Sequence, residues 1–264
     1  MSLQKKTIWI TGASSGIGEA IAYEFNKKGA HLILSARRVE ELERVKESCE
    51  NAEDTVKILP LDLSDQDAMP AKTDQALEFF GSIDMLINNG GISQRAYAID
   101  SDMDTIRRVM EVNYFGTVAL TKAVLPHMVE QNSGHVVVVS SVMGKIGTKH
   151  RSAYAASKHA LHGWFDCLRQ EMYEHGIDVT LVCPGFVKTN VTINALTADG
   201  GRHNKMEDAQ ANAMSAEEFA KKLIPQLARK KEEIFIGGSE LMAVYLKRLS
   251  PWVLNKVLRK VKVT

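Results

Sequence analysis

A tyrosine and a lysine, Tyr154 and Lys158, stand four positions apart in a stretch whose spacing predicts a helix. Residues four apart on a helix lie on the same face. A free tyrosine has a pKa of about 10, but a neighbouring cation stabilises the phenolate and lowers that pKa. Tyr154 would then act as a general acid or base near neutral pH. Ser141 ends an apolar run, and its hydroxyl would hold the substrate oxygen during proton transfer. The alternative is a surface Tyr-Lys pair, which is common on helices.

A glycine-rich stretch near the N-terminus, Thr11-Gly-Ala-Ser-Ser-Gly-Ile-Gly18, follows a β-branched run and precedes apolar residues at helical spacing. Gly12 permits a tight turn, Gly16 leaves room for a phosphate to approach the backbone, and Gly18 allows close helix–strand packing. The amide groups at the start of this helix would then face an anion. Because the spacing is Gly-x-x-x-Gly-x-Gly, an ordinary glycine-rich loop is the competing interpretation.

Two arginines, Arg37 and Arg38, follow the apolar run 31–36. In a dinucleotide-binding fold, an acid at this position holds the 2′-hydroxyl of the NAD ribose, whereas an arginine accommodates the 2′-phosphate of NADP. A guanidinium group makes bidentate, charge-assisted hydrogen bonds to phosphate oxygens. We therefore expect NADP(H), with Arg37 as the main contact. The alternative is that the arginines only open a solvated helix.

The elements that must position these residues alternate regularly along the chain. Apolar runs predict strands at 7–11, 31–36, 56–61, 81–88, 134–141, 177–183 and 233–237, and helical spacing predicts helices at 19–25, 39–53, 64–80, 102–131, 152–175 and 217–231. Such alternation predicts one α/β domain over residues 1–264, with a doubly wound, seven-stranded parallel sheet of the Rossmann type. The poorly patterned segment 190–215 is predicted to be a lid over the substrate.

Composition excludes several classes of protein. The formal net charge is +1, with 33 basic and 32 acidic residues, which argues against a nucleic-acid-binding surface. Three scattered cysteines predict neither a disulfide framework nor a metal site. We also expect no signal peptide and no bilayer-spanning segment, and therefore a soluble, cytoplasmic protein.

Taken in order, these motifs resemble the short-chain dehydrogenase/reductase family over about residues 5 to 190. The matching residues are Thr11-Gly-x-x-x-Gly16-Ile-Gly18, Asn88-Asn89-Gly90-Gly91, Asn113, Ser141, Tyr154-x-x-x-Lys158 and Pro184-Gly185-x-x-x-Thr189. Gly90 stands where the family usually has alanine, a small change that leaves the role of this loop undisturbed. Alone, the loop around Asn89 could equally be a simple turn. The resemblance implies reversible hydride transfer between a nicotinamide dinucleotide and a carbonyl/alcohol pair.

The resemblance also implies roles for individual residues. Tyr154 would protonate the carbonyl oxygen, Ser141 would position it, Lys158 would bind the nicotinamide ribose and lower the tyrosine pKa, and Asn113 would hold a water linked to Lys158. The positions implied in cofactor binding are Gly12, Ser14, Ser15, Gly16, Ile17, Gly18, Arg37, Arg38, Asp62, Leu63, Asn89, Gly90, Tyr154, Lys158, Pro184, Gly185, Val187 and Thr189.

The stretches Leu34-Ser-Ala-Arg-Arg-Val39 and Asn89-Gly-Gly-Ile-Ser-Gln94 resemble orphan reductases and reductases of the steroid or retinoid type. This likeness implies a lipophilic carbonyl or alcohol substrate. Three alternatives are a reductase of 3-oxoacyl thioesters, a sugar reductase, and a non-catalytic NADP-binding sensor. Family members usually assemble through the helices that carry Asn113 and Tyr154, which implies a homodimer or homotetramer.

Several other residues carry separate expectations. The basic segment 246–264 has apolar residues at helical spacing after Pro251, and it predicts either peripheral membrane contact or a helix docked on the core or on a partner subunit. We assign His159 and His162 to a helix face turned away from Tyr154, in contact with solvent or another subunit, and His150 to a structural or substrate-lining place. Three methionines, Met143, Met206 and Met214, are expected near the pocket, mostly as core filling.

Overall fold

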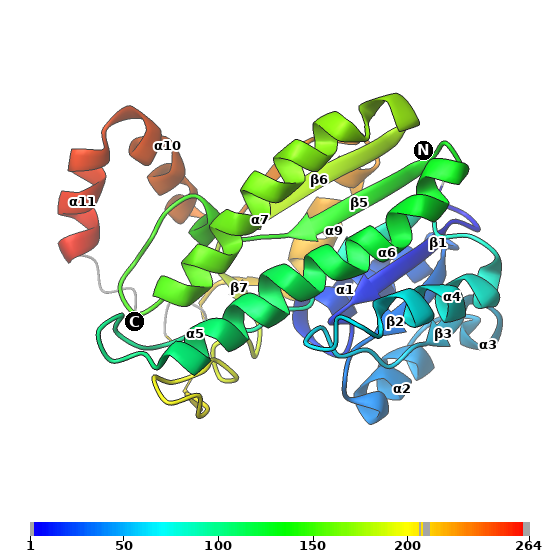
Figure 1. Ribbon diagram of the computed structural model, residues 1–264, viewed down its shortest axis with the longest axis horizontal. Helices are drawn as coiled ribbons and strands as arrows, with labels where there is room; N and C mark the ends of the chain where they lie inside the picture. Colours follow the sequence, from blue (N-terminus) through cyan, green and yellow to red (C-terminus); the bar gives the residue numbers. More distant parts are fainter. Residues whose placement is uncertain (1–2, 206, 208–211, 261–264) are drawn as a thin grey trace.

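Seven short apolar segments lie side by side in a parallel sheet, flanked by helices on both faces (Figure 1). The computed structural model describes residues 3–205, 207 and 212–260. The strand order is β3-β2-β1-β4-β5-β6-β9, which confirms the predicted doubly wound, seven-stranded parallel sheet. These strands are β1 (Thr7–Thr11), β2 (His31–Ser35), β3 (Val56–Ile58), β4 (Met85–Asn88), β5 (Gly134–Val139), β6 (Ile177–Pro184) and β9 (Glu233–Ile236).

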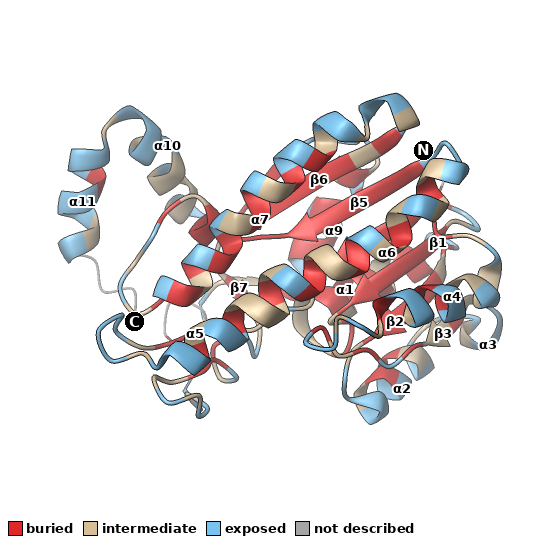
Figure 2. Cartoon of the chain, in the orientation of Figure 1, coloured by how far each residue is buried: buried red, intermediate tan, exposed pale blue. Residues whose placement is uncertain are grey.

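Alternation of side chains along β1 divides the core into two layers. Ile8 and Ile10 pack against one set of helices, whereas Trp9 between them packs against the other set. The first layer holds α1 (Gly16–Asn26), α2 (Val39–Glu47) and α9 (Ala216–Leu227), and the second holds α4 (Met69–Phe80), α6 (Gly116–Glu130) and α7 (Ser152–Glu171). Because both faces are covered, the strands are buried along most of their length (Figure 2).

The order of the strands reverses beside β1, since the chain builds β2 and β3 on one side and β4, β5, β6 and β9 on the other. In open α/β sheets, ligands bind at such a switch point, outside the carboxyl ends of the strands. The loops after β1, β4 and β5 meet at this edge. They carry the glycine-rich stretch, the Asn89 loop and Ser141, which the sequence singles out for chemistry.

Several predicted elements end differently in the structure. The single helix expected over 39–53 is two helices, α2 and α3 (Ala52–Thr55), and the turn between them contains Asn51 with φ of 49°. Asn26 on α1 fixes this turn, because its side chain accepts a hydrogen bond from Glu50 N (2.7 Å) and donates one to Glu50 O (3.0 Å). A tertiary hydrogen bond of this kind leaves no periodic signal in the sequence.

The long helix predicted over 102–131 consists of α5 (Met103–Met110), a π-helical turn (Glu111–Phe115) and α6. A short parallel pair, β7 (Val187–Lys188) and β8 (Met214–Ser215), connects the two ends of the predicted lid. Met206 and residues 208–211 of that lid lie outside the described residues.

The C-terminal segment forms two helices, α10 (Met242–Leu249) and α11 (Pro251–Lys260). Leu254 is buried against Val142, Met143 and Ile146, so α11 docks on the core, as one of the two interpretations expected. Trp252 is 66% exposed, and the Lys256 ammonium lies 3.7 Å from the centre of its ring. Membrane contact through this exposed side stays a prediction, and residues 261–264 lie outside the described part of the chain.

Candidate active site

The glycine-rich loop has the close packing expected of a phosphate-binding turn. Gly12 and Gly16 have φ values of 65° and 61°, a region that L side chains rarely adopt. A Cβ atom on Gly18 would lie 2.4 Å from Gly12 O, so only glycine allows the first turn of α1 to pack on this loop. Because α1 begins at Gly16, its free amide groups face the cavity described below. This cradle fits the pyrophosphate of a dinucleotide.

The Asn89 loop stabilises the glycine-rich loop from the side. The Asn89 side chain donates to Thr11 O (3.0 Å) and Gly12 O (3.2 Å), while the Asn89 and Gly90 amides donate to Thr11 Oγ1 (3.1 and 3.0 Å). A Cβ atom on Gly90 would lie 2.7 Å from Leu63 Cδ1, which is tighter than ordinary packing. The glycine at position 90 thus leaves room for Leu63, where the family usually has alanine.

The two arginines after β2 both line the cavity, but they have different contacts. Arg38 Nη2 donates to Ser14 Oγ (3.2 Å) and Ser15 Oγ (3.4 Å), which places one guanidinium group over the phosphate loop. Arg37 lies close enough to Asp62 to influence its carboxyl group. Burial acts to raise the pKa of Asp62, but hydrogen bonds from Ser64, together with Arg37 and Arg108, bring it below its ordinary value. Sequence reasoning favoured Arg37 as the main contact, and it is Arg38, also predicted to bind the cofactor, that lies beside the loop serines.

Tyr154 and Ser141 come together from different elements, α7 and the end of β5. Ser141 caps a 3-10 turn, because its Oγ accepts a hydrogen bond from Met143 N (3.1 Å). The Ser141 hydroxyl therefore keeps its own hydrogen free to donate. It also interacts with the Tyr154 hydroxyl. Both side chains line the cavity, so the two hydroxyl groups face the same space.

Lys158 and Asn113 lie behind Tyr154. Lys158 Nζ donates to Val139 O (2.8 Å) and lies 5.8 Å from the centre of the Tyr154 ring. Asn113 sits in the π-helical turn and is fully buried, and its side chain is bonded to Ile92 N (2.8 Å), Ile92 O (2.9 Å) and Ser157 Oγ (3.0 Å). The extra residue of a π turn shifts a helix locally and is common at functional sites. Asn113 thereby joins α6, α7 and the loop after β4.

The expected lowering of the Tyr154 pKa by Lys158 does not occur in this structure. Burial raises the pKa of Tyr154, and Ser141, Arg151 and Arg95 oppose that rise. Burial also lowers the pKa of Lys158 to about 8, since a desolvated ammonium group loses stability. The cations that act on Tyr154 here are therefore arginines that the sequence did not single out.

One cavity of about 930 Å³ connects all these parts. It is lined by every residue assigned to the site from the sequence except Gly18, which packs the loop on the sheet, and Asn113, which lies behind the lining residues. Four further arginines, Arg95, Arg108, Arg151 and Arg202, also line it. So does an apolar wall of Met143, Ile146, Met242, Ala243, Leu246, Leu254, Val257 and Leu258. Of these additions, Arg151 had a usable signal, because it stands three residues before Tyr154 at the start of a predicted helix.

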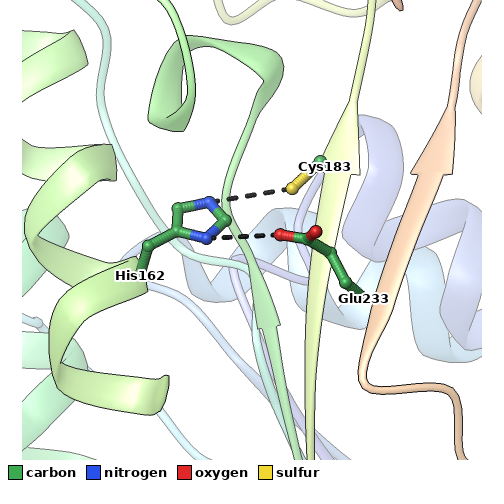
Figure 3. A group of neighbouring side chains, drawn as sticks. All are labelled: His162, Cys183 and Glu233. Atoms are coloured by element: carbon green, nitrogen blue, oxygen red, sulfur yellow. Dashed lines mark hydrogen bonds and ion pairs between the residues drawn. The ribbon is translucent and has the colours of Figure 1, made fainter. Parts of the chain in front are cut away.

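His162 does not lie on a face open to solvent or to another subunit, where the sequence analysis placed it. It is buried, with Nε2 3.0 Å from Ser140 Oγ. Nε2 also lies 3.7 Å from Cys183 Sγ, and Nδ1 lies 3.5 Å from a Glu233 oxygen (Figure 3). The assignment to solvent or a subunit contact was wrong because His162 follows Lys158 by four residues and shares its face of α7. His159 on the next face is exposed.

The group of His162, Cys183 and Glu233 has the residue types of a metal site. However, Cys183 and Glu233 approach opposite nitrogens of the ring, and Glu233 is paired with Lys145 at 2.7 Å. Burial raises the pKa of the Cys183 thiol to about 12, which disfavours the thiolate that binds metals. We therefore interpret the group as a chain of polar contacts that supports the end of β5.

We expect the folded protein to lose stability in acid because two of its histidines, His135 and His162, are buried. Burial lowers the pKa of His135 and of His162 to about 4, below the ordinary value of 6.5. The unfolded chain therefore binds more protons between pH 4 and 6.5, so the stabilising effect is complete above pH 6.5 and is lost as the pH falls through this window. We expect about 3 kcal/mol from each histidine, measured as the free energy of unfolding in urea at pH 7 and pH 4.5.

Replacement of both residues by glutamine should flatten this pH dependence, whereas His159→Gln should leave it unchanged. Equal slopes for the double variant and the original protein would show that other groups cause the acid sensitivity.

A cavity that joins a glycine-rich turn at a helix start to a buried tyrosine, serine and lysine is compatible with an oxidoreductase that uses a nicotinamide dinucleotide. Comparisons with known proteins agree. A model of the short chain dehydrogenase family matches residues 6–199. The chain is 43% identical over 272 residues to the dehydrogenase/reductase SDR family protein 7-like of Anopheles gambiae, covering 99% of this chain and 86% of that protein.

The chain is also 42% identical over 268 residues to dehydrogenase/reductase SDR family member 7 of Homo sapiens, covering 98% of this chain and 79% of that protein. The crystal structure of a short-chain dehydrogenase/reductase from Burkholderia phymatum in complex with NAD has the same fold, with a TM-score of 0.85, 24% identity and 96% of each chain covered. The chain therefore belongs to the short-chain dehydrogenase/reductase family. None of the helices in the described part of the chain has the length and apolar character needed to span a membrane.

Proposed function

We propose that this protein is an NADP(H)-dependent oxidoreductase that interconverts a carbonyl and an alcohol on a lipophilic substrate. The observation that carries the proposal is the shared cavity, in which Tyr154, Ser141 and Lys158 face the same space as the glycine-rich loop and the two arginines after β2. When bound, the nicotinamide ring supplies or accepts the hydride. The protein has to bind and orient both reactants, exclude water, and exchange one proton.

Tyr154 donates that proton to the carbonyl oxygen during reduction and accepts it from the alcohol during oxidation. Ser141 donates a hydrogen bond to the same oxygen, because its Oγ already accepts from Met143 N and leaves the hydroxyl hydrogen available. Lys158 uses one N–H on Val139 O and has two further donors for the hydroxyl groups of the nicotinamide ribose. Asn113 holds the loop after β4 against α7, and a water near Lys158 would complete the path of the proton to solvent.

The substrate end of the cavity supports a lipophilic substrate. Its apolar wall comes from α10 and α11 and from the turn after Ser141. Helices α10 and α11 thus shape this part of the pocket. Asn190, Val191, Asn194, Leu196 and Arg202 of the predicted lid also line the cavity. We further propose assembly as a homodimer or homotetramer through the helices that carry Asn113 and Tyr154, a cytoplasmic location, and peripheral membrane contact through the exposed side of α11.

Cofactor preference tests the first part of the proposal. Arg37→Asp should weaken NADPH binding by about 10- to 100-fold and leave NADH binding nearly unchanged or tighter, since charge-assisted hydrogen bonds to the 2′-phosphate are lost. Fluorescence titration of both reduced cofactors measures the two dissociation constants. Arg107→Gln, which removes an exposed guanidinium paired with Asp104, is the control. Tighter binding of NADH than NADPH by the original protein would contradict the preference.

A further inference from the structure

Arg151 stands where the substrate cavity meets the start of α7. It precedes Tyr154 by three residues, and its carbonyl accepts the Ala155 N–H (2.8 Å), so both side chains emerge from the first turn of the helix. The Arg151 side chain is 9% exposed and lines the cavity. A substrate bound in this cavity next to Tyr154 can therefore contact the Arg151 guanidinium group as well.

Two buried residues hold Arg151 in place. Arg151 Nη2 donates to Glu207 Oε2 (2.7 Å), and Glu207 is also paired with Arg95 through both of its oxygens. Arg95 is occupied by structural contacts, since Nη1 donates to Ser93 Oγ and Gln94 O (both 2.8 Å) and Nη2 also contacts Thr192 Oγ1 (3.3 Å). Glu207 thus anchors the predicted lid to the loop after β4 and to the start of α7.

The charges in this cluster do not balance. Two guanidinium groups share one carboxylate, which leaves one positive charge at a buried position. Arg151 Nε is buried and has no hydrogen-bond partner. A buried donor without a partner and an excess charge are both unfavourable unless a ligand compensates them. Arg95 is saturated, so the unused capacity belongs to Arg151.

Acidic residues of the cavity do not supply the missing anion. Among the described residues, the two acids that line it are Asp62 and Glu240. Asp62 accepts hydrogen bonds from Ser64 N (2.9 Å) and Ser64 Oγ (2.7 Å) at the adenine end. Glu240 accepts from Phe186 N and Gly238 N (both 2.9 Å). Both carboxylates are occupied elsewhere, whereas Arg202 adds a further cation to the lining near the lid.

We propose that Arg151 binds an anionic group of the carbonyl substrate, a carboxylate or a phosphate, and so orients the carbonyl toward Tyr154. This inference rests on the proposed function and makes its substrate class more specific. A planar guanidinium group pairs with either oxyanion through charge-assisted hydrogen bonds. Because α10 and α11 give the same cavity an apolar wall, the substrate is an amphiphile with its acidic group on Arg151 and its hydrocarbon against these helices.

Matched acid and ester substrates test this inference. Oxo fatty acids with the ketone at different chain positions are compared with their methyl esters and with a long-chain ketone that carries a phosphate monoester, using NADPH oxidation to obtain kcat/KM. The original protein should prefer the best anionic compound over its neutral counterpart by about 10- to 100-fold. A preference for the phosphate or for the carboxylate identifies the source of the anion. Calorimetric titration with the preferred acid and its ester gives binding independently of turnover.

Variants of Arg151 distinguish a role in orienting the substrate from a role in folding. Arg151→Gln should bring the ratio of kcat/KM for the acid to that for the ester close to one, because any change in the pKa of Tyr154 affects both substrates alike. Arg151→Lys should restore part of that ratio. Arg107→Gln should change neither rate. If the original protein reduces esters as fast as acids and binds both equally, the inference is wrong while the proposed function stands. If it reduces none of the compounds although NADPH binds, and calorimetry shows no binding of the acid, the inference is overturned. The proposed function is overturned as well if steroid, retinoid and quinone carbonyls are also not reduced. The comparison in the original protein remains decisive even if Arg151→Gln fails to fold.

Discussion

Replacement of Tyr154 by phenylalanine is expected to lower kcat for carbonyl reduction by about 10²- to 10⁴-fold, the usual contribution of a positioned general acid. The aromatic ring stays and only the hydroxyl group is lost, so the cavity and the phosphate loop are preserved. NADPH binding should therefore remain close to that of the original protein. Rates of NADPH oxidation with a panel of steroid, retinoid, quinone and oxo-acid substrates, together with the cofactor dissociation constant, measure both effects.

Tyr97→Phe is the matched control, because Tyr97 is exposed and its ring packs on His150 outside the cavity. Its rates should equal those of the original protein. Unchanged turnover in Tyr154→Phe would exclude this tyrosine as the proton donor. Turnover by neither protein, with NADPH bound by both, would favour the alternative of a non-catalytic NADP-binding sensor.

The second large effect is expected in Gly116→Ala. Gly116 begins α6 directly after the π-helical turn, and a Cβ atom there would lie 2.0 Å from the carbonyl oxygen of Leu63. The clashing atom belongs to the backbone and cannot move aside as the end of a flexible side chain can. The loop that contains Leu63 and helix α6 therefore have to move apart. We expect the free energy of unfolding to fall by about 3 kcal/mol or more. Displacement of Leu63 and Asn113 should also weaken NADPH binding.

Gly163→Ala is the control for this substitution. Gly163 lies within α7, and a Cβ atom there meets nothing within 4 Å. Alanine should therefore stabilise the protein by about 0.5 to 1 kcal/mol through its higher helix propensity. Urea denaturation of the three proteins measures both changes. Equal stability of Gly116→Ala and the original protein would show that the close approach of α6 to Leu63 is not required.

Much of the fold could be predicted because the relevant signals are local. Apolar runs such as 134–139 have the length and composition of buried strands, and the helices repeat their apolar residues every three or four positions. The glycine-rich loop could also be predicted, since Gly12, Gly16 and Gly18 are needed for backbone conformation and close packing. Chain order then places the Asn89 loop and Ser141 at the same edge of a parallel sheet.

Features that depend on contacts between distant segments could not be predicted in this way. Asn26 breaks the helix expected over 39–53 by bonding to Glu50, and Glu207 joins two arginines that are 56 residues apart in the chain. His162 was misplaced because a small error in helix phase exchanges a buried face for an exposed one. The docking of Leu254, and with it the apolar wall of the pocket, likewise needs the three-dimensional arrangement.

The roles proposed for Tyr154, Ser141 and Lys158 could be predicted from residue type, spacing and the family resemblance, because a phenol, an ammonium and a hydroxyl have fixed chemistry wherever the fold brings them together. Their electrostatic setting does not follow. The pKa of Tyr154 depends on burial and on Arg151 and Arg95, which approach it only in the folded protein. Local sequence therefore determines the elements and the chemical groups, whereas desolvation and long-range charge pairing, which exist only after folding, decide how those groups titrate and which substrate they face.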